Sequence, residues 1–158
     1  MLKPAILYKD QIEAQFLELV YSDDFFYYNG YAHESELPKI CLDTGLYQFA
    51  ILDGDDVVGF ISYRIDIPTD CIHRFGLISF RKGNLVVVAD ALHELKRLVK
   101  NHRRIEWYCV SSNPASRLYD KICEHYNGNK LTLHQATCTP NGEIIDCYIY
   151  EILRDQAI

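Results

Sequence analysis

The sequence lacks any apolar run long enough to cross a bilayer, and Met1 to Asp10 contain no apolar stretch of signal-peptide length. It also lacks a positive balance of charge, since 22 acidic residues against 16 basic ones give a formal net charge of −6. Binding to nucleic acid or to an anionic membrane needs a basic face, so the composition argues against both partners. We therefore expect a cytoplasmic protein that holds any anionic ligand at a local site.

No Cys-x-x-Cys pair occurs among the six cysteines, which are scattered through segments that read as strands and helices. Structural disulfides are not expected, and the thiols should stay reduced in a cytoplasm. Two Cys-x-His pairs are present, Cys71–His73 and Cys123–His125, and both residue types are good zinc ligands. Their spacing matches no recurrent zinc pattern, so we read each as a buried cysteine beside a partly exposed histidine and expect no metal.

Internal repeats, low-complexity tracts and Pro/Ser-rich linkers are also missing. The apolar share is 49% and the charged share is 24%, which is typical of a globular protein with a packed core. A chain of 158 residues suits one domain better than two. We therefore read residues 1–158 as a single domain.

Apolar periodicity and turn residues predict the order of the elements. A short strand at Ala5–Tyr8 should precede a helix that Asp10 and Glu13 begin as a capping box. An aromatic stretch at Phe25–Tyr31 is followed by an expected short helix near Ser35–Cys41. Later strands are expected at Tyr47–Leu52, Val57–Ile65, Ile72–Phe80, Ile105–Val110, Lys130–Thr137 and Glu143–Leu153, with helices at Leu85–Lys100 and from Asn113 to about His125.

The segment from Arg104 to Ile122 carries the most specific signal. It resembles the strand and following helix of the GNAT N-acetyltransferases, in which an apolar strand precedes Asn, then Ala, then Leu-Tyr-x-Lys. The matching residues are Asn113, Ala115, Leu118, Tyr119 and Lys121. The Gly-Phe usual in that family is replaced by Glu124-His125-Tyr126. In element order the resemblance covers Tyr47 to Leu153.

The resemblance implies an α/β (α+β) fold with a central mixed sheet of six to seven strands and flanking helices. Two central parallel strands of this sheet would splay apart, and acetyl-coenzyme A would lie in the V-shaped gap. Pantetheine suits such a gap, because its amides can pair with the strand groups that the splay leaves unpaired. The strand segment expected to make this contact is Leu77-Ile78-Ser79.

The pyrophosphate of coenzyme A would need backbone N–H groups at a helix N-terminus. The family's loop for it, Gln/Arg-x-x-Gly-x-Gly/Ala, corresponds to Phe80–Val88, where Gly83 allows close approach and Asn84 can turn left-handed or cap the helix. Val86 and Val88 stand where the family commonly has small residues. Taken alone, the loop is also compatible with a simple basic turn. The full set expected to bind the cofactor is Leu77, Ile78, Ser79, Arg81, Lys82, Gly83, Asn84, Leu85, Val86, Asn113, Ser116 and Tyr119.

The resemblance also implies direct transfer of the acetyl group to an amine, with a base and often a tyrosine that protonates the departing thiolate. Tyr119 matches that tyrosine, although it could instead only pack on its helix. No sequence motif identifies the general base. Glu106 lies on the strand before Tyr119 and is our catalytic candidate, while His73 and Asp66 near the preceding strand stay open as alternatives. Phe25–Tyr31 falls where the family forms its acceptor pocket.

The expected function is thus an acyl-coenzyme A-dependent N-acetyltransferase acting on a primary amine of a small molecule or a protein. Two alternatives stay open. One is a catalytically degenerate GNAT-like binding module, and the other is an interaction domain of the toxin–antitoxin or phage type. A homodimer is compatible with the sequence, which does not specify the acceptor.

Overall fold

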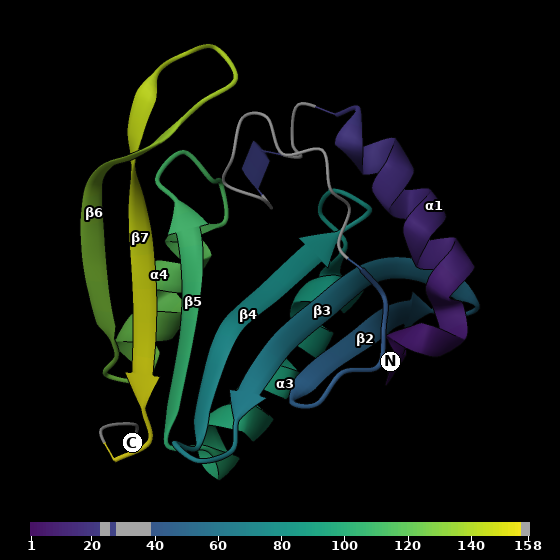
Figure 1. Ribbon diagram of the computed structural model, residues 1–158, viewed down its shortest axis with the longest axis horizontal. Coiled ribbons are helices and arrows are strands. Elements are labelled where there is room, and N and C mark those ends of the chain that lie inside the picture. Colours follow the sequence, from purple (N-terminus) through teal and green to yellow (C-terminus); the bar gives the residue numbers. More distant parts are fainter. Residues whose placement is uncertain (23–25, 28–38, 156–158) are drawn as a thin grey trace.

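The computed structural model describes residues 1–22, 26–27 and 39–155. It contains one mixed sheet of seven strands in the spatial order β1-β2-β3-β4-β5-β7-β6 (Figure 1). The strands are β1 (Leu2–Pro4), β2 (Leu46–Asp53), β3 (Asp56–Asp66), β4 (Cys71–Ser79), β5 (Arg104–Val110), β6 (Asn129–Cys138) and β7 (Ile144–Leu153). The helices with assigned bounds are α1 (Lys9–Val20), α3 (Leu85–Asn101) and α4 (Ser116–His125). The predicted mixed sheet with flanking helices is confirmed.

Neighbouring strands pair in antiparallel fashion except for β4 and β5, which are parallel. The hairpin predicted from Asp-Gly-Asp-Asp is present, with Asp53 opposite Asp56 and Gly54 at a φ of 63° in the turn. A parallel pair needs a crossover connection, and α3 provides it between β4 and β5. This crossover sets the two central strands side by side.

The two faces of the sheet pack against different helices, because successive side chains along a strand point to opposite sides. Ile51 and Ile61 belong to the core cluster that includes the apolar stripe of α3. Their neighbours Ala50 and Phe60 belong to a second cluster with Phe16 of α1. Figure 1 shows α3 and α4 on one side of the sheet and α1 on the other. None of the described helices is both long enough and apolar enough to cross a membrane.

The N-terminal segment differs from the prediction. The first strand is β1, and Ala5–Tyr8 forms a 3-10 turn instead. Pro4 is the last residue of β1 that pairs with β2, because proline has no N–H with which to continue a ladder. Helix α1 begins at Lys9, with Tyr8 at the N-cap and no side-chain cap, so the expected capping box is wrong. The helix expected near Ser35–Cys41 falls largely outside the described residues.

One carboxylate is buried between the sheet and α3. Glu94 is 4% exposed and accepts hydrogen bonds from the Tyr63 hydroxyl at 2.6 Å and from Arg97 Nε at 2.8 Å. Burial alone would raise the pKa of Glu94, but the hydrogen bonds from Arg97 and Tyr63 outweigh it and lower the pKa below its usual value. The ionised Glu94 therefore ties α3 to β3.

Candidate functional site

The central feature is a gap between β4 and β5. Their ladder contains only the pairs Cys71↔Arg104 and Ile72↔Ile105, at the beginning of each strand. From His73 onward β4 has no ladder partner on β5, and Figure 1 shows the two strands diverging toward their C-terminal ends. The splayed parallel pair expected from the resemblance is confirmed.

The backbone of β4 presents hydrogen-bonding groups to this gap. The N–H of Phe80 donates to the Val58 carbonyl at 2.9 Å, so the backbone groups of Phe80 face β3. Because these groups alternate along a strand, those of Ile78 also face β3, whereas those of Leu77 and Ser79 face the gap. The Ile78 side chain packs against the α1 cluster. Of the predicted contact segment, Leu77 and Ser79 therefore present their backbone groups to the gap, and contact with a ligand stays a prediction.

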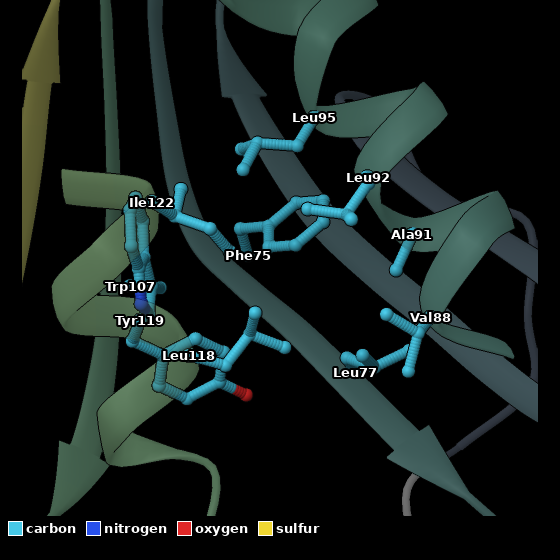
Figure 2. A pocket seen from close by; sticks show the side chains of 10 residues that line it. All are labelled: Phe75, Leu77, Val88, Ala91, Leu92, Leu95, Trp107, Leu118, Tyr119 and Ile122. Carbon is cyan, nitrogen blue, oxygen red and sulfur yellow. The ribbon is translucent and has the colours of Figure 1, made fainter. Parts of the chain in front are cut away.

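An apolar cleft lies on the helix side of the gap. It is bounded by α3, α4 and the strands β4 and β5 (Figure 2). Its lining residues are Phe75, Leu77, Val88, Ala91, Leu92, Leu95, Trp107, Leu118, Tyr119 and Ile122. Among these lining side chains, only Tyr119 and Trp107 carry a polar group. Such a cleft suits a long, mostly apolar chain that carries a few amides.

The predicted phosphate loop leads from β4 into α3. Asn84 caps the helix, since its Oδ1 accepts hydrogen bonds from the N–H groups of Val86 at 2.8 Å and Val87 at 3.4 Å. The left-handed residue of the loop is Gly83, with a φ of 71°, and not Asn84. A Cβ built on Gly83 would meet nothing within 4 Å. The loop thus leaves open space beside a capped helix N-terminus, where an anion is favoured.

The cations and apolar residues of this loop have different surroundings. Arg81 and Lys82 are exposed, and Arg81 Nη2 lies 2.8 Å from Oδ2 of Asp56, the first residue of β3. Leu85 is 80% exposed, while Val86 packs against the core cluster of α3 and Val88 lines the cleft. Val86 therefore supports the helix through its side chain, and only its N–H faces the capping Asn84.

The second motif forms the opposite wall of the cleft. Helix α4 begins at Ser116, three residues after Asn113, so the expected start at Asn113 is wrong. Asn113 instead shapes the preceding turn, because its Oδ1 accepts from the Ala115 N–H at 2.8 Å. Asn113 and Ser116 do not line the cleft, and the Ser116 carbonyl accepts a hydrogen bond from the Tyr150 hydroxyl at 3.4 Å.

Tyr119 points from α4 into the cleft. Figure 2 shows its hydroxyl directed away from α4 toward β4. Its ring packs edge-on against Trp107 and Tyr150, with centroid distances of 6.0 Å and 5.8 Å. The Tyr119 ring thus packs in the core while its hydroxyl faces the cleft, and its catalytic role stays a prediction. Trp107 and Phe75 were not predicted as site residues. Trp107 continues the alternation of β5 from Ile105, whereas Phe75 faces the cleft because the β3–β4 register shifts between His73 and Gly76.

A second group of side chains lies on the other face of the gap. His73 Nδ1 and Glu106 Oε1 are 2.7 Å apart and so bridge β4 and β5. Arg104 Nη2 lies 2.7 Å from Glu106 Oε2, and its Nε donates to Glu151 at 2.6 Å. Two candidates for a base, His73 and Glu106, are therefore in direct contact. Asp66, the third, instead accepts a hydrogen bond from the Thr69 hydroxyl at the start of the β3–β4 turn.

The two Cys-x-His pairs do not meet. Cys71 and His73 lie on β4, and Cys123 and His125 lie on α4. Among the described residues, no group of three or more histidine, cysteine or acidic side chains is arranged to hold a metal ion.

Comparison with known proteins identifies the fold. The sequence matches no protein-family model and no curated protein. The structure resembles a probable GNAT-family acetyltransferase from Chromobacterium violaceum ATCC 12472, with a TM-score of 0.55, 22% identity and coverage of 72% of this chain and 62% of that one. It also resembles a variant of the spermidine N-acetyltransferase from Vibrio cholerae, with a TM-score of 0.59, 18% identity and coverage of 72% and 69%.

A third structure matches over nearly its whole length. The protein smu.2055 from Streptococcus mutans UA159 has a TM-score of 0.67 at 14% identity and covers 98% of this chain and 99% of that one. By contrast, the chain spans 62% of the length of the Chromobacterium protein. At these identities the likeness concerns the fold, and the chain has the fold of the GNAT acetyltransferases.

Proposed function

We propose that this protein is an acyl-coenzyme A-dependent N-acetyltransferase that transfers an acetyl group from acetyl-CoA to a primary amine of a small molecule or a protein. The observation that carries the proposal is the early end of the β4–β5 ladder after Ile72↔Ile105. Beyond it, backbone groups of Leu77 and Ser79 face a gap that opens into an apolar cleft. The capped N-terminus of α3 lies at the end of the same strand.

The residues of this site fit the two chemically distinct parts of coenzyme A. The pantetheine chain is apolar with two amides, and the cleft offers apolar walls with strand groups along one edge. The pyrophosphate is anionic, and the loop offers the N-terminus of α3 with open space at Gly83. Lys82 adds an exposed positive charge beside it.

Tyr119 and the pair of His73 and Glu106 supply the proton transfers in our proposal. Bound acetyl-CoA would supply an activated acyl carbon and a thiol leaving group. The Tyr119 hydroxyl lies in the cleft, where it donates a proton or a hydrogen bond to the sulfur as negative charge develops there. Glu106 supplies a carboxylate on the opposite face of the gap, from which an amine would approach. Its contact with His73 makes this pair the candidate base.

A binding module without catalysis is the second candidate. Two features favour it: Arg81 is already paired with Asp56, and Val88 lines the cleft where the family commonly has a small residue. Such a module would bind coenzyme A or a related ligand without turnover. Measuring binding and transfer separately therefore distinguishes the two functions.

The experiment is a calorimetric titration with acetyl-CoA, followed by thermal unfolding. A ligand that binds only the native state adds about 2.7 kcal/mol of stability at one hundred times its Kd, so melting should shift clearly upward. Adenosine 3′,5′-bisphosphate, which lacks the pantetheine chain, is the control and should bind more weakly. No heat of binding and no shift with saturating acetyl-CoA would contradict the proposal. Binding without acetylation of any amine in a broad screen would favour the binding module.

A further inference from the structure

His73 and Glu106 occupy equivalent positions on β4 and β5, at the closed end of the gap between these strands. Each is the first residue beyond the last ladder pair, Ile72↔Ile105. Ile72 and Ile105 are buried in the cluster on the α3 side, so the side chains that follow them point to the opposite face. His73 and Glu106 therefore bridge the strands where the backbone ladder stops, on the face away from the cleft.

The carboxylate of Glu106 is occupied on both oxygens. Oε1 contacts His73 Nδ1 at 2.7 Å, and Oε2 contacts Arg104 Nη2 at 2.7 Å. An ionised carboxylate accepts hydrogen bonds only, so in this arrangement Nδ1 of His73 carries a proton. Glu106 is thus a poor group to take a proton from a substrate, and a good group to fix an imidazole.

The other nitrogen of His73 is available. Within the part of the chain that the structure describes, no hydrogen bond to Nε2 of His73 is present, and the side chain is 34% exposed. With Nδ1 bearing the proton, Nε2 carries the lone pair of the neutral imidazole. A reachable nitrogen lone pair at the edge of the gap is what a general base requires.

The surrounding charges are few and mostly paired. Arg64 on β3 is directly opposite His73 and pairs with Asp43 at 2.6 Å. Arg74, the next residue on β4, is exposed at a φ of 55°. On β5, the charges that face the imidazole are Glu106 and the Arg104 bound to it.

We propose that His73 is the general base of acetyl transfer and that Glu106 is the positioning residue that holds its tautomer. This inference rests on the proposed function. As the amine nitrogen forms its bond to the acyl carbon, its proton passes to Nε2 of His73, and the carbon–sulfur bond breaks. The thiolate receives its proton from Tyr119, and exchange with water restores both side chains. The catalytic base is therefore His73, rather than the Glu106 favoured from the sequence.

The test compares His73→Gln, Glu106→Gln and, as a matched control, Glu151→Gln. Glu151 contacts the same Arg104 but makes no contact with His73 in the described structure. The probe reaction is acetylation of methylamine by acetyl-CoA, followed as kcat/KM against pH, with cofactor affinity measured by calorimetry. His73→Gln should lower the rate by about 10² to 10⁴-fold and remove the acid limb of the profile, with unchanged cofactor affinity. Glu106→Gln should lower the rate less than His73→Gln does, because the imidazole remains in place while its tautomer is no longer held.

A second readout does not depend on turnover. Nitrogen-15 spectra of the histidine rings, assigned by comparison with His73→Gln, should show His73 protonated at Nδ1 in the native protein, and this preference should be lost in Glu106→Gln. A protein that binds acetyl-CoA but acetylates methylamine no faster than its His73→Gln variant would overturn the assignment. So would a rate that persists in His73→Gln and is lost in Glu106→Gln. Failure to bind acetyl-CoA at all would instead reject the proposed function.

Discussion

Arg81 of the loop before α3 forms an ion pair with Asp56 at the start of β3, at 2.8 Å between Nη2 and Oδ2. The side chains are 54% and 65% exposed, so the pair is solvated and contributes little to stability. Its effect concerns ligand binding instead. A phosphate that approaches the loop must share Arg81 with a carboxylate of the protein.

We therefore predict that Asp56→Asn tightens binding of acetyl-CoA. The gain should be about two- to five-fold at low salt, the size of one exposed ion pair, and it should shrink as salt screens the charges. Asp55→Asn is the matched control, because it removes the same charge from the same turn without an ion pair to Arg81. Calorimetric titrations at two salt concentrations measure the effect. Equal changes in both variants would show that Asp56 acts only through overall charge.

Gly83→Val should abolish cofactor binding while the protein still folds. Gly83 has a φ of 71° and open space where a side chain would project, so valine would obstruct the approach of the pyrophosphate. The strain of a β-branched residue at this φ should cost about 1–3 kcal/mol of stability. Gly142→Val is the control, because Gly142 has a φ of 81°, equally open surroundings and a place in the distant β6–β7 turn. If both variants melt alike and bind acetyl-CoA alike, the loop is only a turn.

Tyr119→Phe should lower turnover by about 10² to 10⁴-fold without weakening cofactor binding, because it removes the acid that assists the leaving thiolate. The matched control is Tyr150→Phe. The Tyr150 hydroxyl donates to Asp120 at 2.8 Å, and burial together with this hydrogen bond raises the pKa of Tyr150 above its usual value. Its loss should reduce stability by about 1 kcal/mol and leave turnover unchanged. A fully active Tyr119→Phe variant would show that the Tyr119 hydroxyl is not the catalytic acid and that the side chain only packs in the core.

Stability should fall in acid partly through Glu94. Its folded-state pKa lies below the usual 4.5, so its ionised form stabilises the folded protein above that pH. This contribution is lost as the pH falls below 4.5 and through the folded-state pKa. Glu94→Gln should therefore be less stable than the native protein at pH 7 and show a shallower decline between neutral and acidic pH. Urea unfolding at a series of pH values measures this, with Glu18→Gln on exposed α1 surface as the control. If the free energy of unfolding declined in parallel in all three proteins, Glu94 would not contribute to the loss of stability in acid.

Much of the fold follows from local patterns in the sequence. The hairpin around Gly54 and the helix after Asn84 are specified by turn residues and by apolar spacing within one element. The errors occurred where tertiary contacts decide, as at Ala5–Tyr8, where strand-like residues continue past Pro4 into a 3-10 turn that buries Ala5. The start of α4 was misjudged because Asn113 uses its side chain in a turn rather than as the helix cap.

The site was only partly predictable for the same reason. The motif identified Tyr119 and the loop at Gly83, which are close in sequence to their helix starts. It could not identify the contact between His73 and Glu106, which are 33 residues apart and meet only because α3 returns the chain to a parallel strand. The Arg81–Asp56 pair joins a loop to a hairpin 25 residues earlier, and no local pattern indicates it.

Hydrogen–deuterium exchange of the free and the acetyl-CoA-bound protein tests the central claim most directly. If the cofactor pairs with the edge of β4 that faces the gap, the Leu77 amide should become protected, together with the first turn of α3. Amides of Ile78 and Phe80, which face β3, should change little. Peptides of β6 and β7 on the far side of the sheet serve as the internal reference. Unchanged exchange along β4 at saturating acetyl-CoA, or protection confined to β6 and β7, would contradict the account.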